Sequence, residues 1–514
     1  MTETISTDIV VIGSGIGGLC CAALLARYGF EVVVCESHSI PGGAAHAFTR
    51  NGYKFDSGPS LHSGLSYSPS TNPLRQVLDA IAEELPCVTY DTWGCLLPEG
   101  NFPATVGADK FCEVLQQFAG KNAIAQWRKL QKVMQPFADA AVAIPPAALR
   151  FDLGAILTAG RFAPALLRHT ANIAKLSGPF SRLMDEVVTD PFIRNWLDLL
   201  CFMLSGLPAE GTSAAEMAFM FAEWYRPDVV LDYPIGGGGA LVEALVRGLQ
   251  RYGGELLLST HVKEILVSGD RAIGVSLRNG KQIKARRAVI SNASTWDTLK
   301  LLPEKALSTK ERIARETTPE CNSFMHLHLG IDGENLPEDL DCHYLVVNNW
   351  EITAPQNVVA ISIPSLLDPS LAPPGKQNIH VYTPATEPYQ LWSELDRQSE
   401  EYDRQKQQRA EVMWQALERI IPDIRDRCEV TLVGTPLTHA RFLRRYHGSY
   451  GPAIPAGKGF FPGHKTTLPG LLCCGDSTFP GIGLPAVAAS GMMAANQLAP
   501  VSKQLEMLQE IGCI

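Results

Sequence analysis

The stretch "TDIVVIGSGIGGLCCAALLARYGFEVVVCES", Thr7–Ser37, decides the fold of this chain. Ile9–Ile12 is a short apolar run that ends at a glycine, as buried parallel strands often do. Leu19–Tyr28 has the composition of a helix, and Gly29 stands where helices commonly end. A second apolar run then closes at Glu36. The order strand, turn, helix, strand predicts a Rossmann-type α/β unit.

The turn carries glycines at the spacing of a dinucleotide-binding motif. Gly13 allows the tight turn, Gly15 lets the backbone approach a pyrophosphate, and Gly18 lets the helix pack close to the strand. The first N–H groups of the helix attract phosphate. Glu36 can accept hydrogen bonds from a ribose and disfavours a 2′-phosphate, which argues against NADP. The expected contacts here are Gly13, Ser14, Gly15, Ile16, Gly17, Gly18, Glu36 and Ser37.

A second glycine pair indicates FAD. "PGGAAHAF", Pro41–Phe48, follows Glu36 closely, and such a pair is typical of FAD enzymes and unnecessary for NAD. Asn51–Ser60 adds a Gly-Pro turn that we expect near the flavin. From the glycine pair the expected cofactor contacts are Gly42, Gly43 and Ala44.

Near the C-terminus the chain has no charged residue between Asp476 and Lys503. A run of this length could span a bilayer. It is rich in Gly, Pro, Ser and Asn, however, and follows the strand-like run "PGLLCC". We therefore expect a buried helix at the cofactor site, with the Asp476 carboxylate on the ribityl chain. The expected contacts are Gly475, Asp476, Gly483, Pro485 and Ala486.

The middle of the chain contributes a strand, a hairpin and a return strand, with turns at Gly269-Asp270 and Asn279-Gly280. The Gly-rich segment 233–249 predicts a close-packed helix entry, because Leu241 replaces the third glycine of a nucleotide motif. The predicted fold is therefore α/β, a discontinuous, glutathione-reductase-like FAD-binding domain with an inserted α+β substrate domain. Its expected parts are 1–75, 228–300 and 432–505 for FAD, and 76–227 and 301–431 for the substrate and membrane side.

Composition narrows the functional classes. The chain has 514 residues, 46% of them hydrophobic, and a net charge of −9, which argues against nucleic acid as a partner. The 13 cysteines show no zinc-binding spacing, and we expect reduced thiols and no metal. The N-terminus has no pattern of a secretory signal or a transit segment.

The first insertion contains a segment that is a candidate for membrane contact. "FDLGAILTAGRFAPALLRHTANIAKLSGPF", 151–180, mixes bulky apolar residues with Arg161, Arg168, His169 and Lys175. It is either an amphipathic element on a membrane surface or a pair of surface helices with one buried face. The uncharged run within 190–208 is too short to span a bilayer.

Several further segments resemble one family. "SHSIPGGAAHAFTRNGYKFDSGPSLHSGLS", "FAEWYRPD", "SNASTWDTLKLLP", "SFMHLHLGID", "VGTPLTHARFLRR" and "LLCCGDSTFPGIGLPAVAASG" are similar to segments of the phytoene-desaturase-like flavoproteins. Within them the chain looks most like the carotenoid (prolycopene) isomerases of plants and cyanobacteria. The resemblance covers nearly the whole chain. It implies that Val262 pairs its backbone with the adenine of FAD.

The resemblance also implies an activity. Reduced FAD, without net redox change, assists conversion of poly-cis-lycopene to all-trans-lycopene. The protein is then peripheral on the cytoplasmic or stromal side of a thylakoid or plasma membrane in a cyanobacterium or plastid. Its electron donor stays unknown. Plant members carry a transit peptide, and no such pattern is visible here.

The sequence does not identify a catalytic side chain. Glu223 and Tyr450 are weak candidates, more easily explained as a surface acid and a core aromatic residue. His326 and His328 should share one face of a strand and are expected in the core or a tunnel wall. Three alternatives stay open: desaturation, saturation or hydration of a carotenoid or retinoid; an amine or porphyrinogen oxidase; and a carrier protein without flavin.

Overall fold

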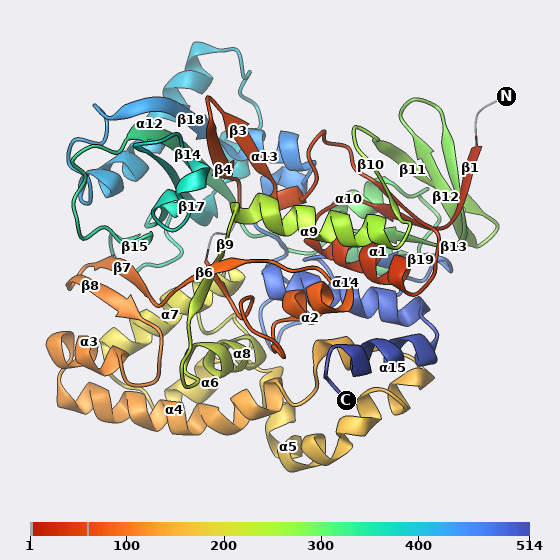
Figure 1. Cartoon of the computed structure of the whole chain (residues 1–514), viewed down its shortest axis with the longest axis horizontal. Helices are drawn as coiled ribbons and strands as arrows, with labels where there is room; N and C mark the ends of the chain where they lie inside the picture. The colour runs from red at the N-terminus through yellow and green to blue at the C-terminus, as the bar shows by residue number, and fades with distance from the viewer. Residues whose placement is uncertain (1–3, 59–60) are drawn as a thin grey trace.

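Two seven-stranded sheets lie side by side and form the body of the molecule (Figure 1). The computed structural model describes residues 4–58 and 61–514. The first sheet, on the right of the figure, is built from segments far apart in the sequence. The second sheet lies on the left, and a lobe of helices lies below both.

The first sheet follows the predicted nucleotide-binding pattern. Its order is β10-β2-β1-β13-β12-β11, with β19 also beside β13. Five strands run parallel to one another: β1 (Thr4–Ile12), β2 (Val32–Cys35), β10 (Glu255–Leu257), β13 (Gln282–Ser291) and β19 (Leu471–Cys473). The antiparallel ribbon consists of β11 (Val262–Ser268) and β12 (Arg271–Leu277). The carboxyl ends of β1, β2 and β19 thus meet at one edge.

Helix α1 (Ile16–Arg27) is buried along nearly its whole length. It begins three residues before the expected start at Leu19, because Gly17 and Gly18 are already helical. A Cβ at Gly18 would lie 2.3 Å from the carbonyl oxygen of Gly13, so only glycine allows this close packing. Gly29 follows the helix with φ +93°, as expected for a residue at a helix end.

The C-terminal uncharged segment forms a buried helix and confirms that interpretation. Strand β19 leads to α14 (Leu484–Leu498), which packs against α1, and α15 (Val501–Glu510) follows. Residues 488–496 of α14 are all buried within the protein. Helix α9 (Gly237–Arg251), from the Gly-rich segment, also packs on α1 as a close-packed helix.

The second sheet joins the two insertions. Its order is β18-β14-β17-β16-β15-β7-β8, and β7 pairs in parallel with β15. The strands are β7 (Thr92–Leu97), β8 (Gly100–Thr105), β14 (Ser323–Asp332), β15 (His343–Val347), β16 (Val358–Ser362), β17 (Lys376–Glu387) and β18 (Cys428–Gly434). Helix α12 (Glu400–Glu418) packs against this sheet. Strand β18 spans the boundary that we expected at residue 432.

The helical lobe packs around a core that it shares with β7 and β8 of the second sheet, in which Trp127 and Trp196 are buried. Its helices are α3 (Phe111–Phe118), α4 (Lys121–Ala141), α5 (Ala163–Leu176), α6 (Ser181–Asp185), α7 (Pro191–Ser205) and α8 (Ala214–Trp224). Short 3-10 helices precede α5: η2 (Pro146–Ala148), η3 (Leu153–Ile156) and η4 (Ala159–Phe162). In residues 4–58 and 61–514, no helix combines the length and apolar character needed to cross a bilayer.

Small elements connect these parts. They are η1 (Gly43–Ala45), β3 (Ala47–Arg50), β4 (Tyr53–Asp56), β5 (His62–Ser63), α2 (Pro73–Ala80), β6 (Cys87–Tyr90), β9 (Leu231–Pro234), α10 (Thr295–Lys300), α11 (Thr309–Glu316), η5 (Pro364–Leu366), η6 (Pro369–Leu371), η7 (Tyr389–Leu391), α13 (Pro436–Leu443) and η8 (Tyr446–Gly448). Strands β3 and β4 pair with each other, and β5, β9 and β6 form a three-stranded sheet.

The crossing of α1 and α14 predicts a stability effect. A Cβ at Gly491 would lie 2.1 Å from the carbonyl oxygen of Gly17. We expect Gly491→Ala to push the helices apart and lower the free energy of unfolding by about 1–3 kcal/mol. At Gly160 a Cβ would meet only the Ala155 oxygen, at 3.9 Å, so Gly160→Ala is the matched control. Equal melting temperatures for the two variants would contradict this account.

Candidate active site

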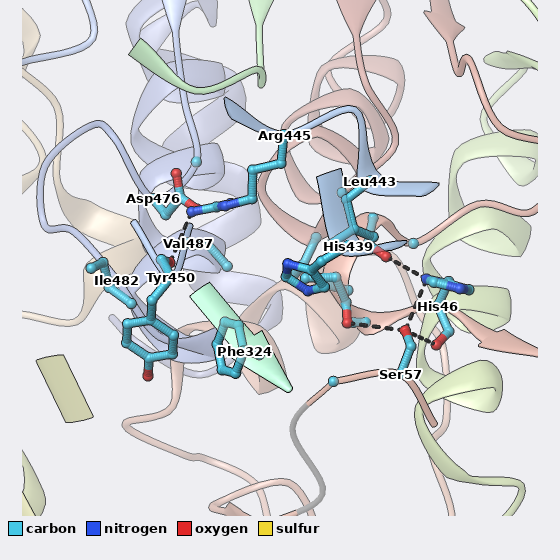
Figure 2. A pocket seen from close by; sticks show the side chains of 18 of the residues that line it. His46, Ser57, Phe324, His439, Leu443, Arg445, Tyr450, Asp476, Ile482 and Val487 are labelled. Atoms are coloured by element: carbon cyan, nitrogen blue, oxygen red, sulfur yellow. Dashed lines mark hydrogen bonds and ion pairs between the residues drawn. The ribbon is translucent and has the colours of Figure 1, made fainter. Parts of the chain in front are cut away.

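A cavity of about 930 Å³ opens where the two sheets meet. One side is lined by the loops at the carboxyl ends of the first sheet, and the other by the second sheet and the helical lobe. Figure 2 shows part of this wall, with Asp476 and Arg445 on one side and Phe324, Tyr450 and His439 nearby. Such a cavity, bordered by two structural units, is a common place for a cofactor and a substrate.

The glycine loop after β1 forms one end of the cavity. Gly13 has φ +90°, a conformation that side chains rarely adopt. A Cβ at Gly15 would lie 2.8 Å from Nδ2 of Asn292, which follows β13 and also lines the cavity. Helix α1 begins directly after Gly15, so the N–H groups of its first turn lie at the cavity. Sequence reasoning did not single out Asn292, which lies far from the loop along the chain.

Glu36 is held in place by the glycine loop. The backbone N–H and the hydroxyl of Ser14 donate to Oε2 of Glu36 at 2.9 and 2.6 Å. The backbone N–H of His38 donates to Oε1 at 2.7 Å. The carboxylate is buried yet lines the cavity, where it can accept a hydrogen bond from a ribose hydroxyl.

The second glycine pair packs directly on the first motif. The N–H of Gly42 donates to the carbonyl oxygen of Ser14 at 3.1 Å. A Cβ at Gly43 would lie 2.9 Å from Cα of Gly15, and Gly43 has φ +57°. Both glycines line the cavity, as do Ser57 and Gly58 of the expected flavin-proximal turn. Residues 59 and 60 of that turn lie outside the described residues.

Asp476 reaches the cavity from the end of β19. Its carboxylate forms an ion pair with Arg445, which also donates to the carbonyl oxygen of Tyr450 at 2.8 Å (Figure 2). Arg445 therefore ties the acid of the first sheet to the loop before Tyr450. The Arg445 side chain was not predicted, because its contact with Asp476 joins segments 31 residues apart that no sequence pattern links.

Most of the residues expected at the cofactor line this cavity. These are Gly13, Gly15, Ile16, Gly17, Glu36, Ser37, Gly42, Gly43, Ala44, Val262, Gly475, Asp476 and Gly483. Four others are not among the lining residues of the described chain: Ser14, Gly18, Pro485 and Ala486. Gly483 is the N-cap of α14 and Pro485 lies in its first turn, as expected.

The two weak catalytic candidates are placed differently. Tyr450 lines the cavity, and its hydroxyl donates to the carbonyl oxygen of Met203 at 3.2 Å. Burial raises the pKa of Tyr450, so the phenol stays protonated. Glu223 is instead part of a polar cluster outside the cavity lining, where it accepts hydrogen bonds from Tyr67 and Thr71. The structure thus gives Glu223 a role in holding the segment around residue 70.

The wall contributed by the insertions has no charged side chain in the described part of the chain. Its members from 76–227 and 301–431 are apolar, aromatic, hydroxyl-bearing or imidazole side chains. They are Trp93, Leu200, Met203, Leu204, Met220, Trp224, Leu301, Phe324, His326, His343, Tyr344, Leu345, Ala360, Ile361, Ser362, His380, Tyr382, Pro384 and Tyr389. Within residues 4–58 and 61–514, no cluster of metal-binding side chains is found.

These features fit a flavin dinucleotide. The glycine loop has no room for side chains, α1 offers its free N–H groups to a pyrophosphate, and Glu36 and Asp476 offer carboxylates at two points along the cavity. Fold and site together define a flavoprotein with an uncharged substrate wall.

Comparison with known proteins agrees with this class. The family model described as flavin containing amine oxidoreductase matches residues 16–499. A chloroplastic prolycopene isomerase of an Oncidium hybrid cultivar is 32% identical over 501 residues, covering 96% of this chain and 84% of the relative. An all-trans-retinol 13,14-reductase of Danio rerio is 25% identical and covers 86% of this chain and 77% of the relative.

A solved oxidoreductase from Methanosarcina mazei shares the fold, with a TM-score of 0.64 at 20% identity, covering 96% of this chain and all of that one.

The chain belongs to the flavin-containing amine oxidoreductase family, and within it to the phytoene-desaturase-like flavoproteins that include the prolycopene isomerases. The resemblance found in the sequence is confirmed. The chain therefore has an FAD-binding fold and is an enzyme of this family.

The position of Asp476 predicts an effect on cofactor binding. Removing a charged hydrogen-bond partner costs about 1.5–3 kcal/mol, so we expect Asp476→Ala to weaken FAD binding roughly tenfold or more. Flavin absorbance after gel filtration and titration with FAD measure the change. Asp423→Ala, at an exposed carboxylate paired with Arg427, is the control. Unchanged flavin occupancy in Asp476→Ala would show that this carboxylate does not hold the cofactor.

Proposed function

We propose that this enzyme converts poly-cis-lycopene to all-trans-lycopene, using reduced FAD without net redox change. The observation that carries the proposal is the uncharged wall that the two insertions give to the cavity. A hydrocarbon polyene has no group for an ion pair, and burying a charge beside it would cost free energy. The likeness to prolycopene isomerases over 96% of the chain supports the same reaction.

The wall residues suit a long, flat substrate. Leu200, Leu204 and Met220 offer aliphatic surface, Phe324 offers an aromatic face, and Tyr450 adds a second aromatic face from outside the two insertions. Aromatic faces attract positive charge, so they stabilise a polyene whose C=C bond order falls as cationic character develops. Water is kept from that charge by the same apolar surface.

The flavin side of the cavity would hold the cofactor through residues already described. Glu36 and Asp476 would bind the ribose and the ribityl chain, and the glycine loop would bind the pyrophosphate. When bound and reduced, the flavin supplies negative charge or electron density beside the polyene. The N-terminus of α14, which begins at Leu484 in the cavity wall, favours negative charge near it.

Another reaction on a similar substrate is the alternative. A relative named as a retinol 13,14-reductase matches most of this chain at 25% identity, so saturation, desaturation or hydration of a carotenoid or retinoid remains the runner-up. An amine substrate is disfavoured, because the insertion wall offers no carboxylate to pair with an ammonium group.

The two reactions differ in product mass. We expect anaerobic incubation of the FAD-loaded protein with poly-cis-lycopene to yield all-trans-lycopene of unchanged mass when the flavin is reduced, and little product when it is oxidised. Chromatography with mass spectrometry measures both. A product two hydrogens heavier or lighter, or heavier by one water, would favour the alternative, and equal rates with oxidised flavin would contradict the need for reduction.

We also propose that the enzyme docks peripherally on an anionic membrane surface, from which a water-insoluble polyene can enter. Leu153, Ile156, Leu167 and Phe460 are between 71% and 87% exposed. The segment 153–184 contains no acidic residue and includes Arg161, Arg168, Lys175 and Arg182. Apolar side chains with basic residues around them suit insertion into an anionic interface.

A ring contact near the start of this segment leads toward the cavity. The ring of Phe151 lies 6.1 Å from that of Phe479, and Ile482, three residues further on, lines the cavity. Because the relatives are named as chloroplastic, we propose a thylakoid or plasma membrane of a plastid or cyanobacterium, on its stromal or cytoplasmic side.

Vesicle binding checks the docking surface. We expect co-sedimentation with vesicles rich in phosphatidylglycerol, weaker binding in high salt, and little binding to phosphatidylcholine alone. Leu153→Asp with Ile156→Asp should reduce binding at least about tenfold, because each charge opposes burial in the interface. Ile313→Asp, at an exposed residue of α11 that is 52% exposed, is the control. Equal binding of the double variant would refute this surface.

A further inference from the structure

Several imidazole rings lie together in and directly behind the uncharged cavity wall. His326 and His328 lie on β14, and His380 lies on β17, opposite His328 in the strand register. The rings of His328 and His380 stack at 4.3 Å with an angle of 3°. His439, from α13, lies 5.3 Å from the ring of His326. His326, His380 and His439 all line the cavity.

Two of these four rings are fixed by the backbone. His328 Nε2 contacts the carbonyl oxygen of Asp56 at 3.1 Å, and His439 Nδ1 contacts that of Gly448 at 2.8 Å. A carbonyl oxygen only accepts, so each of these nitrogens carries its proton and donates it. Their tautomers are thereby set by structural contacts.

His326 and His380 are arranged differently, because they bond to each other. His326 Nδ1 and His380 Nε2 are 3.0 Å apart, so one nitrogen donates and the other accepts. The outer nitrogens, His326 Nε2 and His380 Nδ1, are buried and have no hydrogen-bond partner among residues 4–58 and 61–514. In either tautomer, the neutral pair has one free N–H and one free lone pair at these outer positions.

Unpartnered buried polar groups cost free energy and are uncommon in folded proteins. The pair lies in a cavity wall on which a hydrocarbon offers nothing to bond. A role in moving protons would use both outer nitrogens, one as the donor and the other as the acceptor.

The surroundings keep the pair neutral in its resting form. Burial lowers the pKa of both histidines well below the usual range, and the neighbouring imidazoles lower it further. The groups that face the pair are His328 on β14, Tyr382 on β17, His439 on α13 and His46 beside η1, none of them a carboxylate. Once protonated, such a pair is a strong acid, as protonation of a weakly basic polyene requires.

We propose that the His326–His380 pair is the acid–base group of the isomerisation, an inference that rests on the function proposed above. The protonated pair transfers one proton to a carbon of a C=C bond, which leaves a neutral pair and a carbocation spread over the polyene. The former double bond is then single and rotates. The neutral pair takes a proton back from the same carbon, the C=C bond forms again, and no electron changes hands.

Hydrogen exchange with solvent tests this step. A deuteron added to a carbon that already bears hydrogen leaves both isotopes there, and rotation turns the original hydrogen toward the imidazoles. Isomerisation by the reduced, FAD-loaded enzyme in D₂O should therefore give all-trans-lycopene enriched in deuterium, measured by mass spectrometry. The rate should rise about tenfold for each pH unit lowered between pH 8 and 6, since the protonated pair is scarce.

Two variants test whether the His326–His380 pair carries out this proton transfer. His326→Phe and His380→Phe should each lower the rate and the deuterium uptake at least about 100-fold and flatten the pH profile. Flavin absorbance and melting temperature verify their folding. His62→Phe is the matched control, because His62 is also buried with an unpartnered Nε2 but lies outside the cavity lining.

The outcomes separate the two proposals. Isomerisation by the unaltered enzyme without deuterium in the product overturns the acid–base role and leaves the proposed function intact. Deuterium uptake that persists in both histidine variants also overturns the role of the pair. If the reduced enzyme does not isomerise poly-cis-lycopene at all, both proposals fall.

Discussion

The close crossing of α1 and α14 holds the two ends of the chain at one place, and the cavity depends on it. Gly491 lies so near α1 that any side chain would meet the carbonyl oxygen of Gly17 at 2.1 Å. This contact brings β19 beside β13 and places Asp476 at the same sheet edge as Glu36. Without it, the two carboxylates would not line one cavity.

The second half of the cavity follows from the pairing of the two insertions. Strand β7 of the first insertion pairs with β15 of the second, so the helical lobe is fixed against the second sheet. Together they contribute a wall without charge, while the charged lining residues, such as Asp476 and Arg445, come from the flavin side. The cavity thus separates a polar half that suits a dinucleotide from an apolar half that suits a hydrocarbon.

Local sequence predicted the parts that depend on local geometry. These parts are the glycine loop, Glu36, the second glycine pair and the strand before Asp476. In each of them, a tight turn or a close backbone approach requires particular residues at a fixed spacing. The start of α1 was expected at Leu19 and lies at Ile16. Glycine has a low helix propensity, so the sequence did not indicate that Gly17 and Gly18 belong to the helix. Asn292, Arg445 and the His326–His380 contact arise from strands and loops distant in sequence, so no local pattern reveals them.

The central claim is that the uncharged wall binds the reacting polyene beside the flavin. Leu204 lines this wall, is only partly buried, and so can be changed to Asp without burying a charge fully in the core. The account predicts that Leu204→Asp keeps its FAD and its melting temperature but isomerises poly-cis-lycopene at least about 100-fold more slowly, since the polyene would desolvate a carboxylate. An unchanged isomerisation rate in this FAD-loaded variant would contradict it.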